Sequence, residues 1–386
     1  MHNAYIYDAV RTPRGKAKPD GGLAALTPQE LVKLQITALE SRCGGVVHQA
    51  EALILGCVGQ VGDQGGNIAL ISKLHAGLPD DCAAYSVNNY CASGLSAIGQ
   101  AAASVSSGQA KLIFAGGIEC MSRVPFMGDK AAYYTDNDFP SRTRYIPVVL
   151  AAERLASSES IGRAELDAVS LTSQQRAATA EHNSALQNSR ITTGGLAAEE
   201  CIRPETDAAS LAAMPPAFGA LQEQYAEALA GETFTPQLTL GHAPPVCDGA
   251  GLAVVGGDNL GMKPRARILG FAESGGDPAA SLTAGFNAMD KALAAAGLSL
   301  SDMDRIEFME AFAVTIAKFM RDRNADPARV NVSGGHIAKG HPMGASGAIL
   351  TSTLLDSLDA GGGTFGLVVM SGASGVGTAM VVERVN

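Results

Sequence analysis

The sequence predicts an α/β protein in which a parallel or mostly parallel sheet is covered by helices on both faces. Short apolar runs alternate with alanine-rich amphipathic stretches along most of the 386 residues, and this alternation is typical of repeated strand–helix–strand units. The last third repeats the order of the first. Cys91-Ala92-Ser93-Gly94 and Gly344-Ala345-Ser346-Gly347 each precede a helical stretch that leads into an apolar strand. These observations indicate an internally duplicated α/β unit, although so short an echo also arises by chance in a chain rich in alanine and glycine.

The first third of the chain contains four apolar runs with the length of strands. They cover residues 4–10, 51–59, 83–89 and 111–119. A helix is expected after the first run, because Thr27 is a suitable N-cap and Pro28 suits the first helical position. A second helix is expected from Cys91 through Ala103, where small residues follow the third run.

The last third contains a similar series of runs. Strands are expected over residues 265–274, 305–308 and 366–375, and helices over residues 288–296 and after Gly347. Residues 330–332 end at a glycine-rich loop. Residues 120–242, between the two halves, hold most of the irregular polar sequence. This middle region is therefore interpreted as an inserted excursion that is partly helical.

Composition and charge exclude several classes of protein function. The net charge is −10 and no basic patch is present, which argues against a nucleic-acid partner. No apolar run approaches the roughly 20 residues of a membrane span, and the first residues lack the pattern of a secretory signal. The seven cysteines form no CxxC pair and no Cys/His cluster. We therefore expect no disulfide framework, no metal site and a reducing cytoplasm as the compartment.

Cys91 lies between a strand-like and a helix-like run, so its thiol is expected at a helix N-terminus. The positive end of the helix dipole favours thiolate there and can lower the thiol pKa below its free value of about 8.5. The small residues that follow leave room for a substrate, and they let the backbone N–H of Cys91 face an oxyanion. The alternative at this point is a buried structural cysteine, which is the more common role of a free thiol.

A second candidate site is the loop over residues 331–347, which contains five glycines and two histidines. Pro342 biases His341 away from helical geometry, and an imidazole held there can act as a general base or donate to an oxyanion. The loop matches neither a phosphate-binding loop nor a dinucleotide-binding turn. The alternative is a glycine-rich turn with one satisfied core histidine.

Taken together, these motifs resemble those of the thiolase family and stand in that family's relative positions. The segments that carry the resemblance are Asp8–Lys16, Cys91–Gly94, Gly116–Ser122, Glu310–Ala313 and Gly334–Gly347. It covers nearly the whole chain and is weakest from about residue 126 to residue 243.

The resemblance implies a duplicated five-layer αβαβα fold with an inserted loop domain. Residues 1–119 would form the first half, completed by about residues 243–262. Residues 120–242 would form the loop domain, and residues 263–386 the second half. The family resemblance also implies at least a homodimer, with a homotetramer as the other possibility.

The same resemblance implies acyl-CoA chemistry, namely thioester Claisen condensation and its reverse, thiolytic cleavage of a 3-ketoacyl-CoA. Cys91 would accept the acyl group and His341 would activate it, so that acyl transfer proceeds in two steps. Coenzyme A thioesters would be substrates, and neither a metal nor a redox cofactor is implied. The substrate-binding positions that follow are Ala243, Pro244, Phe312 and Gly340.

Several positions depart from the family pattern. Ser371 stands where a second catalytic cysteine is expected, and a hydroxyl is a far weaker acid than a thiol. Met309 replaces an asparagine that normally holds a water of one oxyanion hole, which a thioether cannot do. Ala373 replaces a glycine of the other oxyanion hole, but its backbone N–H is retained. Pro244 and Pro245 stand where a serine contact is usual.

His336 stands where thiolases usually carry a small or apolar residue. It is either a replacement acid–base group for the missing cysteine or a surface or packing residue.

Three functions therefore remain open from the sequence. The first is a thiolase-type acyltransferase acting through Cys91. The second is a diverged enzyme of the same fold that transfers or hydrolyses an acyl group or condenses an unusual thioester. The third is a catalytically weak protein that binds acyl thioesters. The loss of two catalytic positions favours the third, whereas retention of Cys91 and the histidine loop argues against it.

Overall fold

A ten-stranded sheet runs through the protein in the computed structural model, which describes residues 2–136 and 138–385. The strands follow the order β4-β3-β5-β6-β1-β7-β10-β9-β8, and the short strand β2 pairs with β6 beside this path. Their bounds are β1 Tyr5–Arg11, β2 Gly15–Lys16, β3 Ala52–Gly56, β4 Ala83–Val87, β5 Leu112–Cys120, β6 Cys247–Gly256, β7 Ala266–Gly275, β8 Arg305–Phe308, β9 Phe365–Gly372 and β10 Val376–Arg384.

The strand order is the same in both halves when it is read outward from the central pair β1 and β7. Outward from β1 come β6, β5 and β3, and outward from β7 come β10, β9 and β8. The directions also agree, because in each half the first two pairs are antiparallel and the third is parallel. The duplication predicted from the sequence is therefore confirmed by the topology.

The sheet is mixed, so the prediction of a parallel or mostly parallel sheet is wrong. Parallel pairing is confined to β3 with β4, β3 with β5 and β8 with β9 among the described strands. No sequence pattern indicated a strand over β6 or β10, and every antiparallel pair except β1 with β7 involves one of them. β10 follows β9 after the short turn Ala373–Gly375, and so short a connection permits only antiparallel pairing.

Helices complete the layers on both faces of the sheet. Their bounds are α1 Pro28–Cys43, α2 Val46–Gln49, α3 Ile68–Ala76, α4 Ser93–Ser106, α5 Val148–Ser158, α6 Arg163–Glu181, α7 Ala208–Ala212, α8 Ala220–Gln224, α9 Ala284–Ala296, α10 Phe312–Arg323, α11 His336–Lys339 and α12 Ser346–Gly361. Thr27 caps α1 through a capping box with Glu30, and Pro28 opens the helix as predicted. No helix in the described part of the chain is both long and apolar enough to span a membrane.

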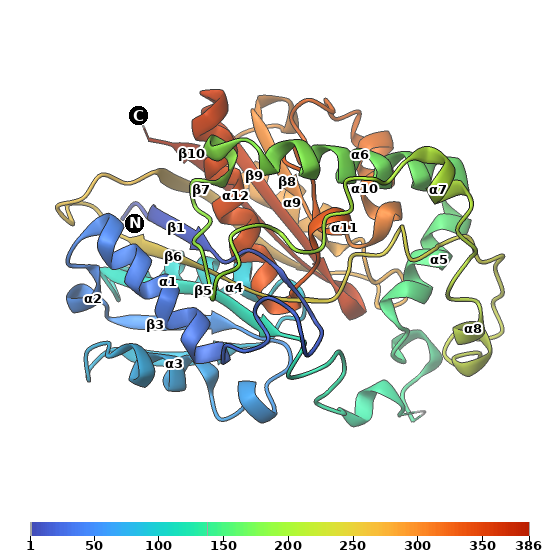
Figure 1. Ribbon diagram of the computed structural model, residues 1–386, viewed down its shortest axis with the longest axis horizontal. Helices are drawn as coiled ribbons and strands as arrows, with labels where there is room; N and C mark the ends of the chain where they lie inside the picture. Colours follow the sequence, from blue (N-terminus) through green and yellow to red (C-terminus); the bar gives the residue numbers. More distant parts are fainter. Residues whose placement is uncertain (1, 137, 386) are drawn as a thin grey trace.

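Helices α4 and α12 lie between the two halves of the sheet. Helix α4 packs on β3, β5 and β6 and also contacts β10, whereas α12 packs on β8 and β9 and also contacts β1 and β6. Helices α1 and α3 cover the other face of the first half, and α9 covers the other face of the second half (Figure 1). This arrangement is the predicted five-layer order.

The echoed small-residue segments form the starts of these two central helices. Helix α4 begins at Ser93 and α12 at Ser346. A side chain at Gly94 would meet the carbonyl oxygen of Gly344 at 2.6 Å, and one at Gly347 would meet the backbone nitrogen of Leu95 at 2.5 Å. The two helix N-termini therefore approach each other as closely as backbones allow. This contact brings the Cys91 turn and the histidine loop together.

The middle of the chain leaves the sheet after β5 and returns to it at β6. The described residues between these strands form α5, α6, α7 and α8 with connecting loops and contain no sheet strand, in agreement with a partly helical excursion. Helix α6 packs on α10 and α11, so the excursion contacts the second half. The division into residues 1–119, 120–242 and 263–386 remains a prediction.

Most of the other strands and helices expected from the sequence lie close to the observed ones. Residues 330–332 lead into the glycine-rich loop as expected, and of these only Val330 forms an isolated bridge, to Ile306. Asn331 has a positive φ of 45°, which ends extended structure at once and turns the chain into the glycine-rich loop.

Candidate active site

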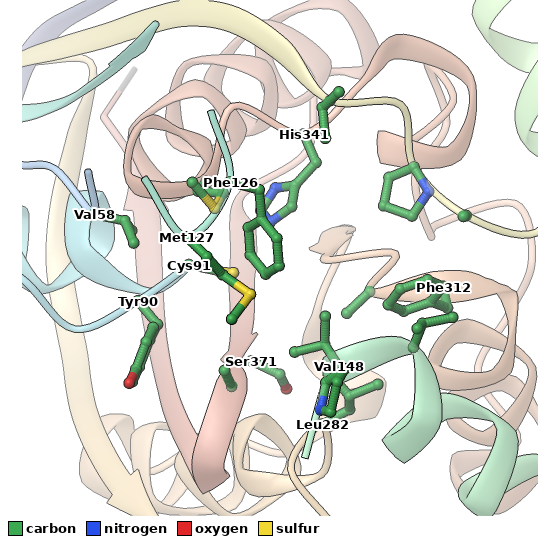
Figure 2. A pocket seen from close by; sticks show the side chains of 18 of the residues that line it. Val58, Tyr90, Cys91, Phe126, Met127, Val148, Leu282, Phe312, His341 and Ser371 are labelled. Atoms are coloured by element: carbon green, nitrogen blue, oxygen red, sulfur yellow. The ribbon is translucent and has the colours of Figure 1, made fainter. Parts of the chain in front are cut away.

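An apolar cavity of 410 Å³ opens between the two halves and the inserted region. Figure 2 shows the side chains of Cys91, His341 and Ser371 directed to this cavity from different parts of the chain. The sequence-predicted site residues that line it are Cys91, Ala243, Pro244, Met309, Phe312, His341, Ser371 and Ala373. Gly340 and His336 do not line it. No group of three or more His, Cys, Asp or Glu side chains in the described residues is placed to hold a metal ion.

The turn that carries Cys91 is fixed by its neighbours. Tyr90 adopts a left-handed φ of 46°, a conformation that costs a non-glycine residue energy and is frequent at functional sites. The Ser93 hydroxyl donates to the Tyr90 carbonyl at 2.5 Å and accepts the N–H of Asn89 at 2.8 Å. Cys91 is therefore held between the end of β4 and the start of α4, as the sequence predicted.

The charge state of Cys91 differs from the sequence-based expectation. Burial, followed by the nearby Glu119 carboxylate, raises the pKa of the thiol to about 12. The expected lowering by the helix N-terminus is thus outweighed, because desolvation disfavours the thiolate more strongly. We therefore expect a neutral Cys91 thiol at neutral pH.

Two backbone N–H groups face the Cys91 sulfur. They belong to Cys91 and Ala373, and hydrogen bonding from both acts to lower the pKa of the thiol. Ala373 follows β9, and the N–H of the next residue, Ser374, donates to the Ser281 hydroxyl at 3.0 Å. The pair of N–H groups forms a pocket for negative charge, which is the geometry of an oxyanion hole.

His341 presents a neutral imidazole to the same cavity. Its Nδ1 lies 2.7 Å from the Ser346 hydroxyl oxygen, whereas its Nε2 has no hydrogen-bond partner in the described part of the chain. Burial and, to a smaller extent, the Arg14 guanidinium lower the pKa of His341 to about 3. Because the Ser346 contact occupies Nδ1, Nε2 is the atom available to accept a proton from the thiol.

Arg14 lies behind the histidine loop and is itself fully buried. Its Nε and Nη2 donate to the Glu199 carboxylate at 2.9 and 3.0 Å, and its Nη1 donates to the Gly340 carbonyl at 3.4 Å. This places the Gly340 carbonyl against Arg14, and a substrate-binding role for Gly340 stays a prediction.

His336 packs edge-on against His341, behind the cavity wall. The two ring centroids are 5.1 Å apart with an interplanar angle of 89°. His336 is fully buried, and neither of its ring nitrogens has a hydrogen-bond partner among the described residues. Burial, His341, Arg14 and Lys339 all lower its pKa well below the usual value. Its ring therefore touches the candidate base and has no contact with the cavity.

Acidification is expected to destabilise the protein through these two histidines. In the unfolded chain they bind protons below about pH 6.5, whereas the lowered pKa values of His336 and His341 keep the folded rings neutral. The stability that depends on the neutral rings is therefore lost as the pH falls from 6.5. Replacing His336 with phenylalanine should reduce the slope of unfolding free energy against pH by about 1.4 kcal/mol per pH unit.

Urea unfolding at pH 5 and at pH 7.5 measures this slope. His48→Gln, a change at an exposed position of α2, controls for the loss of a histidine. An unchanged slope in His336→Phe would show that His336 is protonated in the folded state.

Glu119 organises the site, although the sequence analysis gave it no role. Its carboxylate accepts the N–H groups of Val58 at 2.9 Å, Gly59 at 3.0 Å and Gly344 at 3.0 Å, and the amide of Gln64 at 2.8 Å. It therefore ties the loop after β3 to the histidine loop. The available signal was a single carboxylate at the end of an otherwise apolar strand.

Ser371 and Met309 complete the wall of the cavity. The Ser371 hydroxyl oxygen accepts the N–H of Gly285 at 3.2 Å, which leaves its proton available to the cavity. Met309 lies directly after β8 and is 3% exposed. Among the described residues, no hydrogen bond joins either side chain to a basic side chain.

Comparison with known proteins agrees with this geometry. The family models described as "Thiolase, N-terminal domain" and "Thiolase, C-terminal domain" match residues 4–256 and 262–384. A beta-ketoadipyl-CoA thiolase of Pseudomonas knackmussii is 35% identical, with 99% of each chain covered. A steroid 3-ketoacyl-CoA thiolase of Mycobacterium tuberculosis is 32% identical, with 100% of this chain and 95% of the relative covered. The crystal structure of an acetyl-CoA acetyltransferase of Bacillus anthracis superposes with a TM-score of 0.85 at 28% identity, covering 100% of this chain and 99% of the other.

Proposed function

Because the chain belongs to the thiolase family and is a thiolase-type acyl-CoA acyltransferase, we propose that Cys91 carries the acyl group and that His341 is its base. The observation that carries the proposal is the placement of the Cys91 thiol beside two backbone N–H groups in a cavity that His341 also lines. A nucleophile, a base and an oxyanion hole are the parts that acyl transfer requires.

Acylation begins from two neutral groups. His341 Nε2 accepts the thiol proton as the Cys91 sulfur attacks the thioester carbonyl carbon, and the carbonyl oxygen takes up the negative charge. That oxygen lies between the N–H groups of Cys91 and Ala373. When the tetrahedral intermediate collapses, the bond to the CoA sulfur breaks, and the leaving thiolate takes the proton from His341. The products are an acyl-Cys91 thioester and free CoA.

Cleavage of a 3-ketoacyl-CoA needs one further proton donor. Attack of Cys91 at the 3-keto carbon breaks the bond between C2 and C3, and the departing acetyl-CoA carbanion must be protonated at C2. Ser371 occupies the position for this donor, but its hydroxyl is a weak acid without a hydrogen bond to a basic side chain of the described residues. Met309 offers no hydrogen bond to an enolate oxygen. We therefore propose that acyl transfer is the efficient step and that carbon–carbon cleavage is slow.

His336 is placed to act only through His341. The edge-on contact limits rotation of the His341 ring, and no atom of His336 lines the cavity. We propose a positioning role rather than a second acid–base role. The steps above need no cofactor, since the chain supplies every group and the CoA thioester is the substrate. The cytoplasm remains our proposed compartment, because seven cysteines without a paired motif suit reducing conditions.

Mass spectrometry tests the proposed function. The protein is incubated with acetyl-CoA or acetoacetyl-CoA, the intact and peptide masses are measured, and CoA-dependent cleavage is assayed. An acetyl group on Cys91 from acetyl-CoA, with slow cleavage of acetoacetyl-CoA, is the expected result. If the acyl group on Cys91 is lost to water without a CoA acceptor, the result would favour an enzyme that hydrolyses acyl thioesters. If no adduct forms with either thioester, the result would favour the third function, a catalytically weak protein that binds acyl thioesters.

We also propose that the partner of this chain is a second copy. Strand β4 is last in the strand order, so one of its edges has no partner strand in the described chain. Beside it, Leu70 and Leu74 of α3 and Tyr85 of β4 are 40%, 67% and 40% exposed. An unpaired edge with exposed apolar side chains is a surface that soluble proteins usually cover.

The double change Leu70→Asp with Leu74→Asp is expected to convert a dimer to a monomer, because it places charge in the proposed interface. Light scattering after size-exclusion chromatography measures the mass. Leu240→Asp is the matched control, since Leu240 is 66% exposed and lies far from β4 in the sequence. A parent protein that is monomeric at micromolar concentration would contradict the proposal.

A further inference from the structure

The cavity extends from Cys91 in two directions. Figure 2 shows Val58 and Tyr90 on one side of Cys91, and Val148, Leu282 and Phe312 on the other. Phe312 is one of the substrate-binding positions that the family resemblance implies, so the CoA part of a bound thioester is assigned to its side of the cavity. Since a thioester bound at Cys91 has its CoA part on one side, its acyl part must extend to the other side.

We call this other side the acyl subsite. From the residues that line the whole cavity, we assign to it Val58, Tyr90, Met121, Phe126, Met127 and Met343. Val58, Met121 and Met343 form one buried apolar cluster, against which Tyr90 packs. Three thioethers and two aromatic rings make an apolar wall that adapts its shape to the ligand.

Two tyrosines extend this apolar surface beyond Met127. The rings of Tyr134 and Tyr145 have centroids 4.9 Å apart, and both line the cavity. The Tyr134 hydroxyl donates to the Asp129 carboxylate at 3.0 Å, and the Tyr145 hydroxyl contacts the Met127 sulfur at 3.9 Å. Because these hydroxyls are engaged, the tyrosines offer mainly their rings to a ligand.

The charges around the subsite are unsuited to an acidic ligand. No lysine or arginine is among the residues that line the cavity. The Asp129 carboxylate lies at the edge of the subsite, where it accepts the Tyr134 hydroxyl at 3.0 Å, and the Glu119 carboxylate adds to the effect of burial in raising the pKa of the Cys91 thiol. A carboxylate on the acyl chain would lose its water and meet like charge.

The surrounding cations are already engaged. The Arg14 guanidinium, behind His341, is paired with Glu199. Arg144 lies beyond the tyrosines, where it pairs with Glu227 and donates to the Phe139 carbonyl. Lys130 is on the exposed surface of the segment that carries Met127. None of these side chains lines the cavity.

We propose that the acyl subsite selects uncharged acyl groups that reach the methionine and aromatic side chains, and that it rejects acyl groups ending in a carboxylate. The proposal rests on the proposed function of the same cavity. The proposed selectivity distinguishes this chain from the relatives named beta-ketoadipyl-CoA thiolase, a name that refers to a dicarboxylic acyl group. Met127 and Phe126 would be specificity-determining residues, since both line the cavity and Met127 contacts the Tyr145 hydroxyl at 3.9 Å.

Hexanoyl-CoA and adipyl-CoA provide a matched test, because their acyl chains have the same length and differ only in a terminal methyl or carboxylate. The acylation rate of Cys91 with hexanoyl-CoA should exceed that with adipyl-CoA by about 100-fold or more, since an unpaired carboxylate is costly to bury. A phenyl-bearing thioester, 4-phenylbutanoyl-CoA, should acylate at least as fast as hexanoyl-CoA. Equal rates with hexanoyl-CoA and adipyl-CoA would overturn the proposal, as would acylation by acetyl-CoA alone.

A charge placed in the subsite should reverse the preference in part. Met127→Lys is expected to shift the rate ratio toward adipyl-CoA by about tenfold or more, because the new ammonium pairs with the carboxylate. Thr135→Lys is the matched control, since it adds the same charge on the same segment at an exposed position outside the cavity lining. If Met127→Lys does not fold, Phe126→Lys serves the same purpose. An equal shift in Thr135→Lys and Met127→Lys would overturn the subsite assignment.

Equilibrium binding separates this proposal from the proposed function. In Cys91→Ser the cavity is retained, and the competition of hexanoyl-CoA and adipyl-CoA for the site can be followed without acylation. Tighter binding of hexanoyl-CoA supports the subsite even if no thioester acylates the parent, in which case the proposed function alone fails. Equal binding of the two thioesters would overturn the subsite even if acetyl transfer is efficient.

Discussion

Replacement of Cys91 by serine is expected to lower acyl transfer from acyl-CoA by on the order of 10⁴-fold, the scale seen when a catalytic nucleophile is removed. In the proposed step His341 takes the proton of the thiol, and a serine hydroxyl is both a weaker acid and a poorer nucleophile than a thiol. The cavity and the two N–H groups remain, so substrate binding should persist. Single-turnover acylation with labelled acetyl-CoA measures the loss.

Cys43→Ser is the matched control, because Cys43 is also a free cysteine but lies at the end of α1, outside the cavity lining. The parent rate is expected in this variant. If Cys91→Ser retained more than a tenth of the parent rate, the nucleophile would be another group.

The double variant Ser371→Cys with Met309→Asn is expected to speed cleavage of acetoacetyl-CoA by about 100-fold or more, while the rate of Cys91 acylation stays close to that of the parent. A thiol at position 371 is a better acid for the departing carbanion than the hydroxyl. An amide at position 309 supplies a hydrogen bond to the enolate oxygen, and one such donor is worth about 100-fold or more in rate. Steady-state release of acetyl-CoA with free CoA as acceptor measures the gain.

Two further variants separate the effect of the acid and the hydrogen-bond donor from the effect of side-chain packing. Met309→Leu keeps an apolar side chain of similar volume and adds no donor, so it should show no gain. Ser371→Ala removes the hydroxyl and should lower the slow cleavage further while sparing acylation. If the double variant cleaves no faster than the parent, the limit lies elsewhere, for example in the fit of the acyl subsite.

The fold was predictable because local signals agreed with the tertiary structure. Thr27 and Pro28 mark the start of α1 in any context, since capping depends on neighbouring residues alone. The echo at Ser93 and Ser346 was informative because both segments must be small where the two central helices meet. By contrast, the direction of a strand depends on connections far along the chain, and so the antiparallel partners β6 and β10 were not foreseen.

The members of the site were predictable, but their electrostatic states were not. The resemblance brought Cys91, His341, Ser371 and Met309 together, and the structure places all four around one cavity. A pKa depends on burial and on charges from several elements. Burial and then the Glu119 carboxylate raise the pKa of Cys91, and Glu119 is not adjacent to Cys91 in the sequence. The ring nitrogens of His336 likewise lack hydrogen-bond partners among the described residues because of tertiary packing, which a sequence pattern does not reveal.

The contacts of Glu119 also have a consequence for folding kinetics. Its carboxylate joins Val58 and Gly344, which lie 61 and 225 positions away from it along the chain. Closing so long a loop costs chain entropy before the contact returns any stability. The geometry around Cys91 is therefore expected to form late, after each half has gained most of its own structure. Recovery of acyl-transfer activity during refolding would then report the docking of the two halves, rather than the formation of either half alone.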